Sequence, residues 1–130
     1  MRSRHLLLAG LLAFLVACGG GAAPTAGDIS AEETLARIEK SDAPLLLDVR
    51  TPEEFAAGHV PAAWNLPIDQ LPARLAELAS HRSSGVIVYC ERGPRAARAI
   101  EELRAAGFTD VQHLSGDMSG WREAGLPVER

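Results

Sequence analysis

The residues best suited to chemistry are six consecutive ones, CERGPR, in which the thiol of Cys90 is followed by arginines at positions 92 and 95. They lie between the apolar run VIVY and a segment whose apolar residues recur at helical spacing. A thiol between a strand and a helix meets backbone N–H groups that lack a helical partner, together with the positive end of the helix dipole. Such surroundings favour a thiolate, because nearby positive charge can lower the pKa of a cysteine from about 8.5 to about 3.5–7.5.

The other residues of this loop have opposing effects. Arg92 and Arg95 add positive charge that would attract an anionic reactant, and Gly93 lets the loop curl so that its N–H groups converge on one atom. Glu91 opposes a thiolate if its carboxylate points inward, and Pro94 supplies no N–H. A reactive thiol therefore competes with the usual alternative for a lone cysteine, a buried and inert side chain.

The elements that would position this loop alternate along the chain. Nearly continuous apolar residues predict buried strands at 45–49 and 85–90, and shorter strands are expected at 62–68 and 111–114. Helices are expected at 31–40, 52–57, 71–81, 96–106 and 118–125. Two of these helices carry start signals, namely Ser30 with Glu33, and Thr51 with Pro52 and Glu54.

Strands that alternate with helices over short connections predict an α/β fold with a central parallel sheet of about five strands and helices on both faces. A length of 130 residues with 47% hydrophobic residues suits a single domain, which we place at residues 28–130. Ligands of such sheets bind where the strands end. Because Asp48 and Cys90 both stand at strand ends, we expect them at the same edge of the sheet.

The first residues predict export. Residues 1–17 combine a basic start with an apolar run of about twelve residues, which suits a signal peptide better than a membrane-spanning helix of about 20. The segment LVAC resembles the lipobox of bacterial lipoproteins, which implies cleavage before Cys18 and a lipid anchor on that cysteine. Residues 18–27 then form a flexible tether, and the domain lies on the periplasmic side of the cell envelope. An ordinary secretory signal remains the alternative.

Composition excludes several function classes. Removing residues 1–17 takes away Arg2 and Arg4 but no acid, so the net charge moves from −4 to about −6. An acidic domain with 5% aromatic residues is not expected to bind nucleic acid. The four histidines have no cysteine or carboxylate at ligand spacing, so we expect no metal and no cofactor. Lipidation of Cys18 would leave Cys90 without a disulfide partner.

Three segments together resemble a single-domain rhodanese over about residues 38–129: LLLDVRTPEEFAAGHVPAAWNLPI, VIVYCERGPRAARAIEELRAAGF and VQHLSGDMSGWREAGLPVE. The resemblance implies a rhodanese-like fold and a sulfurtransferase. Its loop cysteine takes sulfane sulfur from thiosulfate, polysulfide or a persulfide, holds it as a persulfide, and passes it to cyanide, a thiol or a protein acceptor.

The resemblance also implies roles for particular residues. Cys90 would be the catalytic nucleophile, and the loop from Glu91 through Arg92, Gly93 and Pro94 to Arg95 would cradle the sulfur and attract the donor. Asp48 and Arg50 match polar positions near the rim of the site, although Asp48 could instead tie down loop N–H groups and Arg50 could pair with Glu53 or Glu54. We expect His59 to be structural, and Trp64 and Trp121 to lie in the core.

Three alternatives remain beside the sulfurtransferase. Related phosphatases and arsenate reductases use a C-x5-R loop, whereas Arg95 comes one residue earlier here and leaves room for one sulfur rather than a phosphate. The domain could also be a catalytically silent binding module, or a thiol redox sensor at the envelope. Glu91, Ala62 and Asp117 depart from the residues usual in the family, and an acid at position 91 could favour a thiol or polysulfide donor over thiosulfate.

Overall fold

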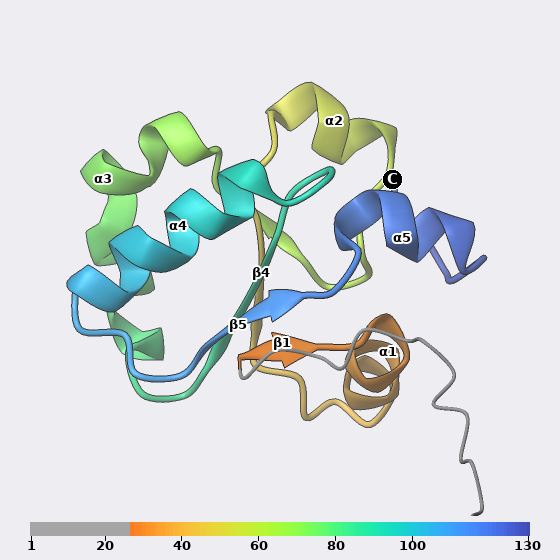
Figure 1. Cartoon of the computed structure of the whole chain (residues 1–130), viewed down its shortest axis with the longest axis horizontal. Coiled ribbons are helices and arrows are strands. Elements are labelled where there is room, and N and C mark those ends of the chain that lie inside the picture. Colours follow the sequence, from red (N-terminus) through yellow and green to blue (C-terminus); the bar gives the residue numbers. More distant parts are fainter. Residues whose placement is uncertain (1–26) are drawn as a thin grey trace, which may run out of the picture.

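Five parallel strands form one sheet at the centre of residues 27–130, the part of the chain that this computed structural model describes (Figure 1). The strands are β1 (Asp28–Ile29), β2 (Leu45–Asp48), β3 (Trp64–Asn65), β4 (Val86–Tyr89) and β5 (Val111–Leu114). Their order across the sheet is β1-β5-β4-β2-β3, and every pair is parallel. The predicted signal peptide, the lipidation site at Cys18 and all but the last residue of the tether lie outside the described residues.

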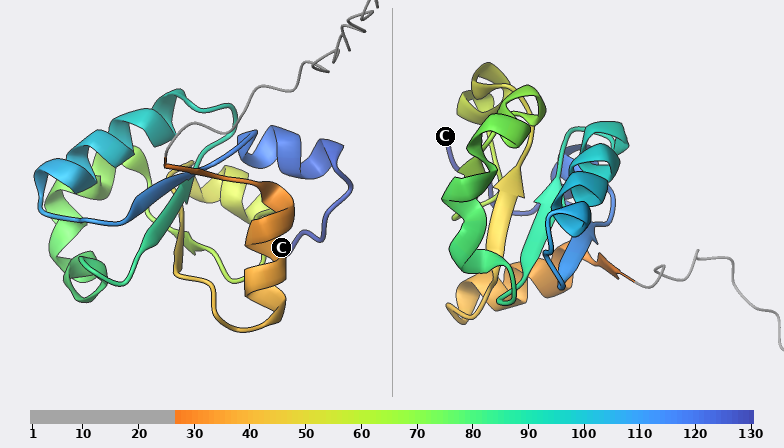
Figure 2. Two further views of the ribbon diagram at one scale, coloured as in Figure 1. Left: turned by 60° about the horizontal axis from the view of Figure 1, so that its bottom comes forward. Right: turned by 90° about the vertical axis from the view of Figure 1, so that its left-hand side faces the viewer.

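Helices cover both faces of the sheet. They are α1 (Ala31–Glu39), α2 (Pro52–Ala57), α3 (Leu71–Arg74), α4 (Pro94–Ala105) and α5 (Asp117–Glu123), with short 3-10 helices η1 (Ile68–Gln70) and η2 (Leu75–His81). In Figures 1 and 2, α3 and α4 lie on one side of the sheet, while α1 and α5 lie on the other. The predicted α/β class with a five-stranded parallel sheet is confirmed.

Alternation along the central strands divides the core into two apolar layers. In β2, Leu45 and Leu47 face the layer beneath α3 and α4, whereas Leu46 faces the layer beneath α1 and α5. In β4, Val88 and Tyr89 divide in the same way. Because both faces are covered, the two strands can be almost wholly apolar, as the sequence predicted.

The predicted helix starts are observed. The Ser30 hydroxyl accepts a hydrogen bond from the Glu33 N–H at 3.1 Å and begins α1. At α2 the capping box is complete, because Thr51 accepts from the Glu54 N–H and the Glu54 carboxylate accepts from the Thr51 N–H. The α2 box matters for the site, since it fixes the position of Glu54.

The structure differs from the sequence-based expectation at three places. The first strand, β1, was not predicted, because two residues carry no detectable alternation. The segment 71–81 is a short α-helix continued by a 3-10 helix rather than one regular helix. Trp64 was expected in the core but is 54% exposed, because the two-residue edge strand β3 leaves its ring against His81 at the surface. Trp121 is fully buried, as expected.

No helix within residues 27–130 is both long and apolar enough to cross a membrane.

Replacement of one core side chain tests this packing. Leu103 lies on α4, is fully buried and belongs to the layer between α4 and the sheet. We expect Leu103→Ala to lower the free energy of unfolding by about 2–5 kcal/mol, because the cavity is not refilled. Glu101→Ala, at an exposed position of the same helix, should change it by less than about 0.5 kcal/mol. Urea titration followed by circular dichroism measures both, and equal effects would contradict the assignment.

Candidate active site

Cys90 follows β4 directly and begins the loop that leads into α4. Its Sγ accepts a hydrogen bond from the Gly93 N–H at 3.0 Å, so one amide of the loop points at the sulfur. Gly93 has a φ of 118°, which an L side chain rarely adopts, and this explains the need for glycine. Cys90 is only 1% exposed and contacts the apolar layer beneath α4, so its thiol is covered and not open to solvent.

The first turn of α5 holds the start of this loop. The N–H of Met118 donates to the carbonyl of Cys90 at 3.0 Å, and the N–H of Ser119 donates to that of Glu91 at 3.1 Å. In return the Cys90 N–H donates to the Asp117 carboxylate at 3.0 Å. The loop is therefore bonded on both sides of the cysteine to a helix that follows it by 27 residues.

Asp48 and Cys90 stand at the same edge of the sheet, because β2 and β4 are neighbours with Asp48 opposite Tyr89. The Asp48 carboxylate does not reach the cysteine loop. It binds the Arg50 guanidinium, with Oδ2 and Nη2 2.7 Å apart, and both side chains are at most 2% exposed. Arg50 also donates to the Gly58 carbonyl at 2.8 Å. The alternative that Arg50 pairs with Glu53 or Glu54 is therefore wrong, because its guanidinium is bound by Asp48.

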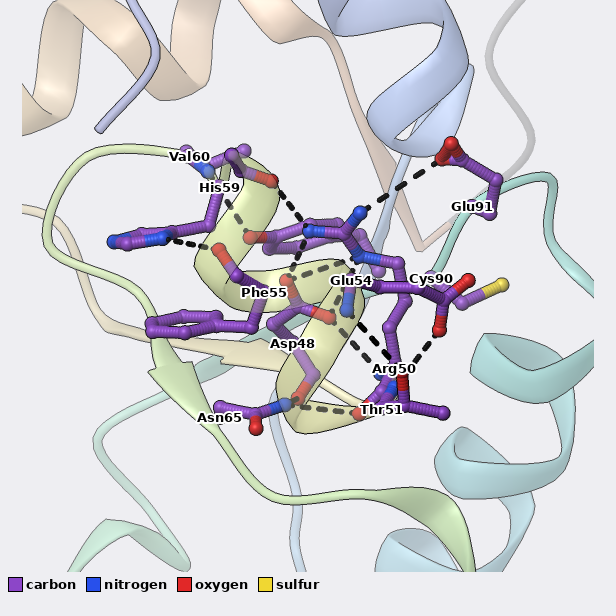
Figure 3. A network of polar contacts seen from close by, with 12 residues as sticks. Asp48, Arg50, Thr51, Glu54, Phe55, His59, Val60, Asn65, Cys90 and Glu91 are labelled. Atoms are coloured by element: carbon purple, nitrogen blue, oxygen red, sulfur yellow. Dashed lines mark hydrogen bonds and ion pairs between the residues drawn. The ribbon is translucent and has the colours of Figure 1, made fainter. Parts of the chain in front are cut away.

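The buried ion pair has a clear electrostatic signature. Burial alone would lower the pKa of Arg50, but the hydrogen bond and charge of Asp48 raise it above its ordinary value. Burial raises the pKa of the neighbouring Tyr89 hydroxyl, which accepts the Val60 N–H at 3.1 Å. Figure 3 shows this network, with the sulfur of Cys90 pointing away from the Asp48–Arg50 pair. The pair thus lies beside the cysteine loop and is not directed at the sulfur.

Glu91 does not lie against the thiol. Its Oε1 pairs with the Arg122 guanidinium of α5, and its Oε2 is 3.9 Å from Nη1 of Arg50. Oε2 is buried and has no hydrogen-bond partner. In Figure 3 the Glu91 carboxylate points toward α5. Arg122 and Arg50 therefore compensate the negative charge of Glu91, the residue that follows Cys90 in the sequence.

The two arginines of the loop lie in different surroundings. Arg95 forms a two-point pair with Glu54 of α2, at 2.8 and 3.0 Å, and each side chain is about one-third exposed. Arg95 lowers the pKa of Glu54 to about 2, and Glu54 in turn raises that of Arg95. Arg95 also interacts electrostatically with Cys90. Arg92 is exposed, so it is the loop cation accessible to an incoming anion.

A pocket of about 240 Å³ opens beside the loop. Its charged walls are Arg50, Arg122, Arg130, Glu54 and Glu91. Glu91 lies in its wall and directly follows Cys90 in the chain, so the pocket borders the cysteine loop. Three of its five charged side chains are arginines, whose guanidinium groups suit an anionic small molecule.

The structure adds polar residues that the sequence did not assign to the site. Arg122 and Asp117 come from α5, and His113 comes from the end of β5, where its Nε2 lies 2.9 Å from the Asp117 carboxylate. Only one signal in the sequence pointed to them, namely that Asp117 departs from the residue expected from the family resemblance. His59 is structural, as expected, because its ring stacks on Phe55 and its Nδ1 bonds the Phe55 carbonyl.

A parallel α/β sheet with a cysteine loop between a central strand and a helix defines the class of fold. A family model described as "Rhodanese-like domain" matches residues 30–124. The chain therefore belongs to the rhodanese-like domain family.

The chain resembles several members of that family. It is 35% identical over 101 residues to a protein named "Sulfurtransferase" from Allochromatium vinosum, which covers 78% of this chain and 92% of that protein. It is also 35% identical over 99 residues to an uncharacterized protein of Synechocystis, although these cover only 54% of that relative's length. The structure aligns with a thiosulfate sulfurtransferase from Pseudomonas aeruginosa with a TM-score of 0.73 and 30% identity, over 81% of this chain and 20% of that one.

The buried ion pair beside the cysteine loop can be tested by removing one partner. We expect Arg50→Leu to lower the free energy of unfolding by about 3–5 kcal/mol, because Asp48 would be left buried without a counter-charge. Arg74→Leu is the matched control, since Arg74 and Glu77 form an exposed pair and its loss should change stability little. Chemical unfolding of both variants gives the comparison. Similar stability of the two variants would mean that the Asp48–Arg50 pair is not buried in solution.

Proposed function

We propose that this protein is a sulfurtransferase that carries sulfane sulfur as a persulfide on Cys90. The observation that carries the proposal is the hydrogen bond from the Gly93 N–H to Sγ of Cys90, within a loop that has the family's position between strand and helix. A donor aimed at the sulfur stabilises negative charge on it. Membership of a family with members named sulfurtransferases supports the same activity.

The proposed reaction has two steps. In the first, the Cys90 thiolate attacks the outer sulfur of thiosulfate, the S–S bond of thiosulfate breaks, and sulfite leaves with the electron pair. In the second, cyanide or a thiolate attacks the terminal sulfur of the persulfide. The S–S bond to Cys90 then breaks, and thiocyanate or a new persulfide leaves while the Cys90 thiolate is restored.

Burial of the thiol sets a condition on both steps. At 1% exposure, Cys90 cannot be reached by a donor unless part of the loop moves aside. Arg92 and the arginine-lined pocket beside Glu91 are the groups that would hold an anionic donor or acceptor nearby. Because Arg122 and Arg50 compensate Glu91, its charge gives little reason to disfavour thiosulfate, so thiosulfate stands beside polysulfide among the proposed donors.

Intact mass spectrometry tests the proposal directly. The full-length chain with Cys18→Ser keeps Cys90 as its only thiol. After incubation with thiosulfate or inorganic polysulfide it should gain the mass of one sulfur atom, and cyanide should remove it with release of thiocyanate. The same chain with Cys90→Ala should gain nothing. A folded protein that forms no adduct with either donor would refute the sulfurtransferase.

Two added measurements, a cellular assay of Cys90→Ala and a reaction with peroxide, separate the alternatives. A silent binding module would give no sulfur adduct, and its cellular effect would survive Cys90→Ala. A redox sensor would form sulfenic acid with peroxide more readily than a persulfide at equal doses.

The proposal includes a location. Export by residues 1–17 and acylation of Cys18 would place the domain on the periplasmic side of a bacterial membrane, where it would meet a small-molecule or protein acceptor. Support comes from the sequence alone, through the apolar run and LVAC.

Metabolic labelling tests this location. In bacteria given an alkyne analogue of palmitate, the full chain should become labelled and remain in the membrane fraction. Cys18→Ser should abolish both the label and the membrane association, whereas Cys90→Ala should preserve them. Labelling that survives Cys18→Ser would show that the lipid is not on this cysteine.

A further inference from the structure

Asp117 occupies an unfavourable position for an aspartate. Its φ of 55° lies in the left-handed region, which glycine adopts freely and other residues rarely do. Its side chain is only 4% exposed, so a carboxylate has been removed from water. Glycine at this position would avoid both costs. The interactions of the Asp117 side chain must therefore compensate.

Those interactions converge on the cysteine. Oδ1 of Asp117 accepts the Cys90 N–H at 3.0 Å, and both carboxylate oxygens lie 2.9–3.0 Å from Nε2 of His113. A carboxylate only accepts hydrogen bonds, so Nε2 carries a proton. A Cβ added at Gly93 would lie 3.4 Å from Oδ2 of Asp117 and 4.0 Å from Cε1 of His113, which places the pair directly behind the loop.

We propose that Asp117, held by His113, is a positioning residue that fixes Cys90 through its N–H and so keeps the sulfur under the Gly93 amide. Protonated His113 balances the buried carboxylate, so that no net negative charge stands behind the anionic sulfur. This inference rests on the proposed persulfide chemistry but adds two residues to it.

The charged groups around His113 favour its protonated form. The hydrogen bond and charge of Asp117 raise the pKa of His113, burial opposes this, and Asp28 of β1 contributes from 3.9 Å. From α4, Glu101 and Arg104 line the same hollow as His113 and carry opposite charges. As pH rises through the raised pKa, His113 loses its charge and the Asp117 carboxylate is left without a counter-charge.

This loss of charge gives a pH signature. Below the His113 midpoint the pair is neutral, and an anionic donor can bring sulfur to Cys90. Above the midpoint one negative charge remains behind the loop and repels both the thiolate and the donor. Asp117→Asn removes that charge, but its amide oxygen can still accept the Cys90 N–H. Asparagine also tolerates the left-handed backbone conformation at this position.

The experiment measures the first half-reaction, sulfur uptake from thiosulfate, by quenched-flow mass spectrometry of the full-length Cys18→Ser chain. Asp117→Gly relieves the backbone but removes the bond to Cys90, and it should lower the limiting rate by about tenfold or more. Asp117→Asn should restore the limiting rate below the His113 midpoint. The ratio of the rate of Asp117→Asn to that of the parent chain should then rise with pH through that midpoint.

Two further measurements need no sulfur donor. NMR titration should show the His113 pKa falling toward its ordinary value in Asp117→Asn, and amide exchange at Cys90 should accelerate in Asp117→Gly only. Asp110→Asn is the control for charge. Asp110 is exposed and lies directly before the first residue of β5, at the other end of this strand from Asp117. This substitution should leave all of these readouts unchanged.

The outcomes are distinguishable. If the parent chain takes up sulfur and folded Asp117→Gly does so at an unchanged rate, the positioning role is refuted while the sulfurtransferase stands. A rate ratio that stays flat with pH refutes the charge balance. If the parent chain takes up no sulfur, the proposed function fails, and Cys90 amide exchange decides alone whether Asp117 fixes the loop.

Discussion

The site depends on the bonds between the first turn of α5 and the residues that follow β4. A loop between a strand and a helix has several backbone groups without regular partners, and here the carbonyls of Cys90 and Glu91 are satisfied by amides of α5. The Cys90 N–H is satisfied by Asp117. With these groups occupied from behind, the Gly93 amide turns to the sulfur. The thiol environment is therefore built by two segments that are far apart in the sequence.

Charge compensation is the second organising feature. Four ion pairs surround the site: Arg50 with Asp48, Arg95 with Glu54, Arg122 with Glu91, and His113 with Asp117. An arginine-rich loop read in isolation suggests a strongly positive opening, but of its two arginines Arg95 is neutralised by Glu54, and Arg92 is the exposed cation. The field at the sulfur thus depends on nearby dipoles and on how each pair is oriented, more than on a count of arginines.

The sequence predicted the local features well. The residues of the inner strands β2, β4 and β5, the capping box of α2 and the position of Cys90 between β4 and α4 all follow from patterns within a few neighbouring residues. The partners of the site could not be predicted in this way. Glu54 meets Arg95 across 41 residues, and Glu91 meets Arg122 across 31. Such pairs depend on how the helices pack on the sheet, and no local periodicity encodes them.

Both outer strands of the sheet, β1 and β3, are only two residues long, whereas the three inner strands have four each. Most of the apolar strand sequence is therefore inside the sheet, and the two edges expose few unpaired backbone N–H and C=O groups. A neighbouring molecule therefore has almost no exposed edge to which it could add a β-strand. This architecture protects a sheet with such hydrophobic central strands from edge-to-edge self-association.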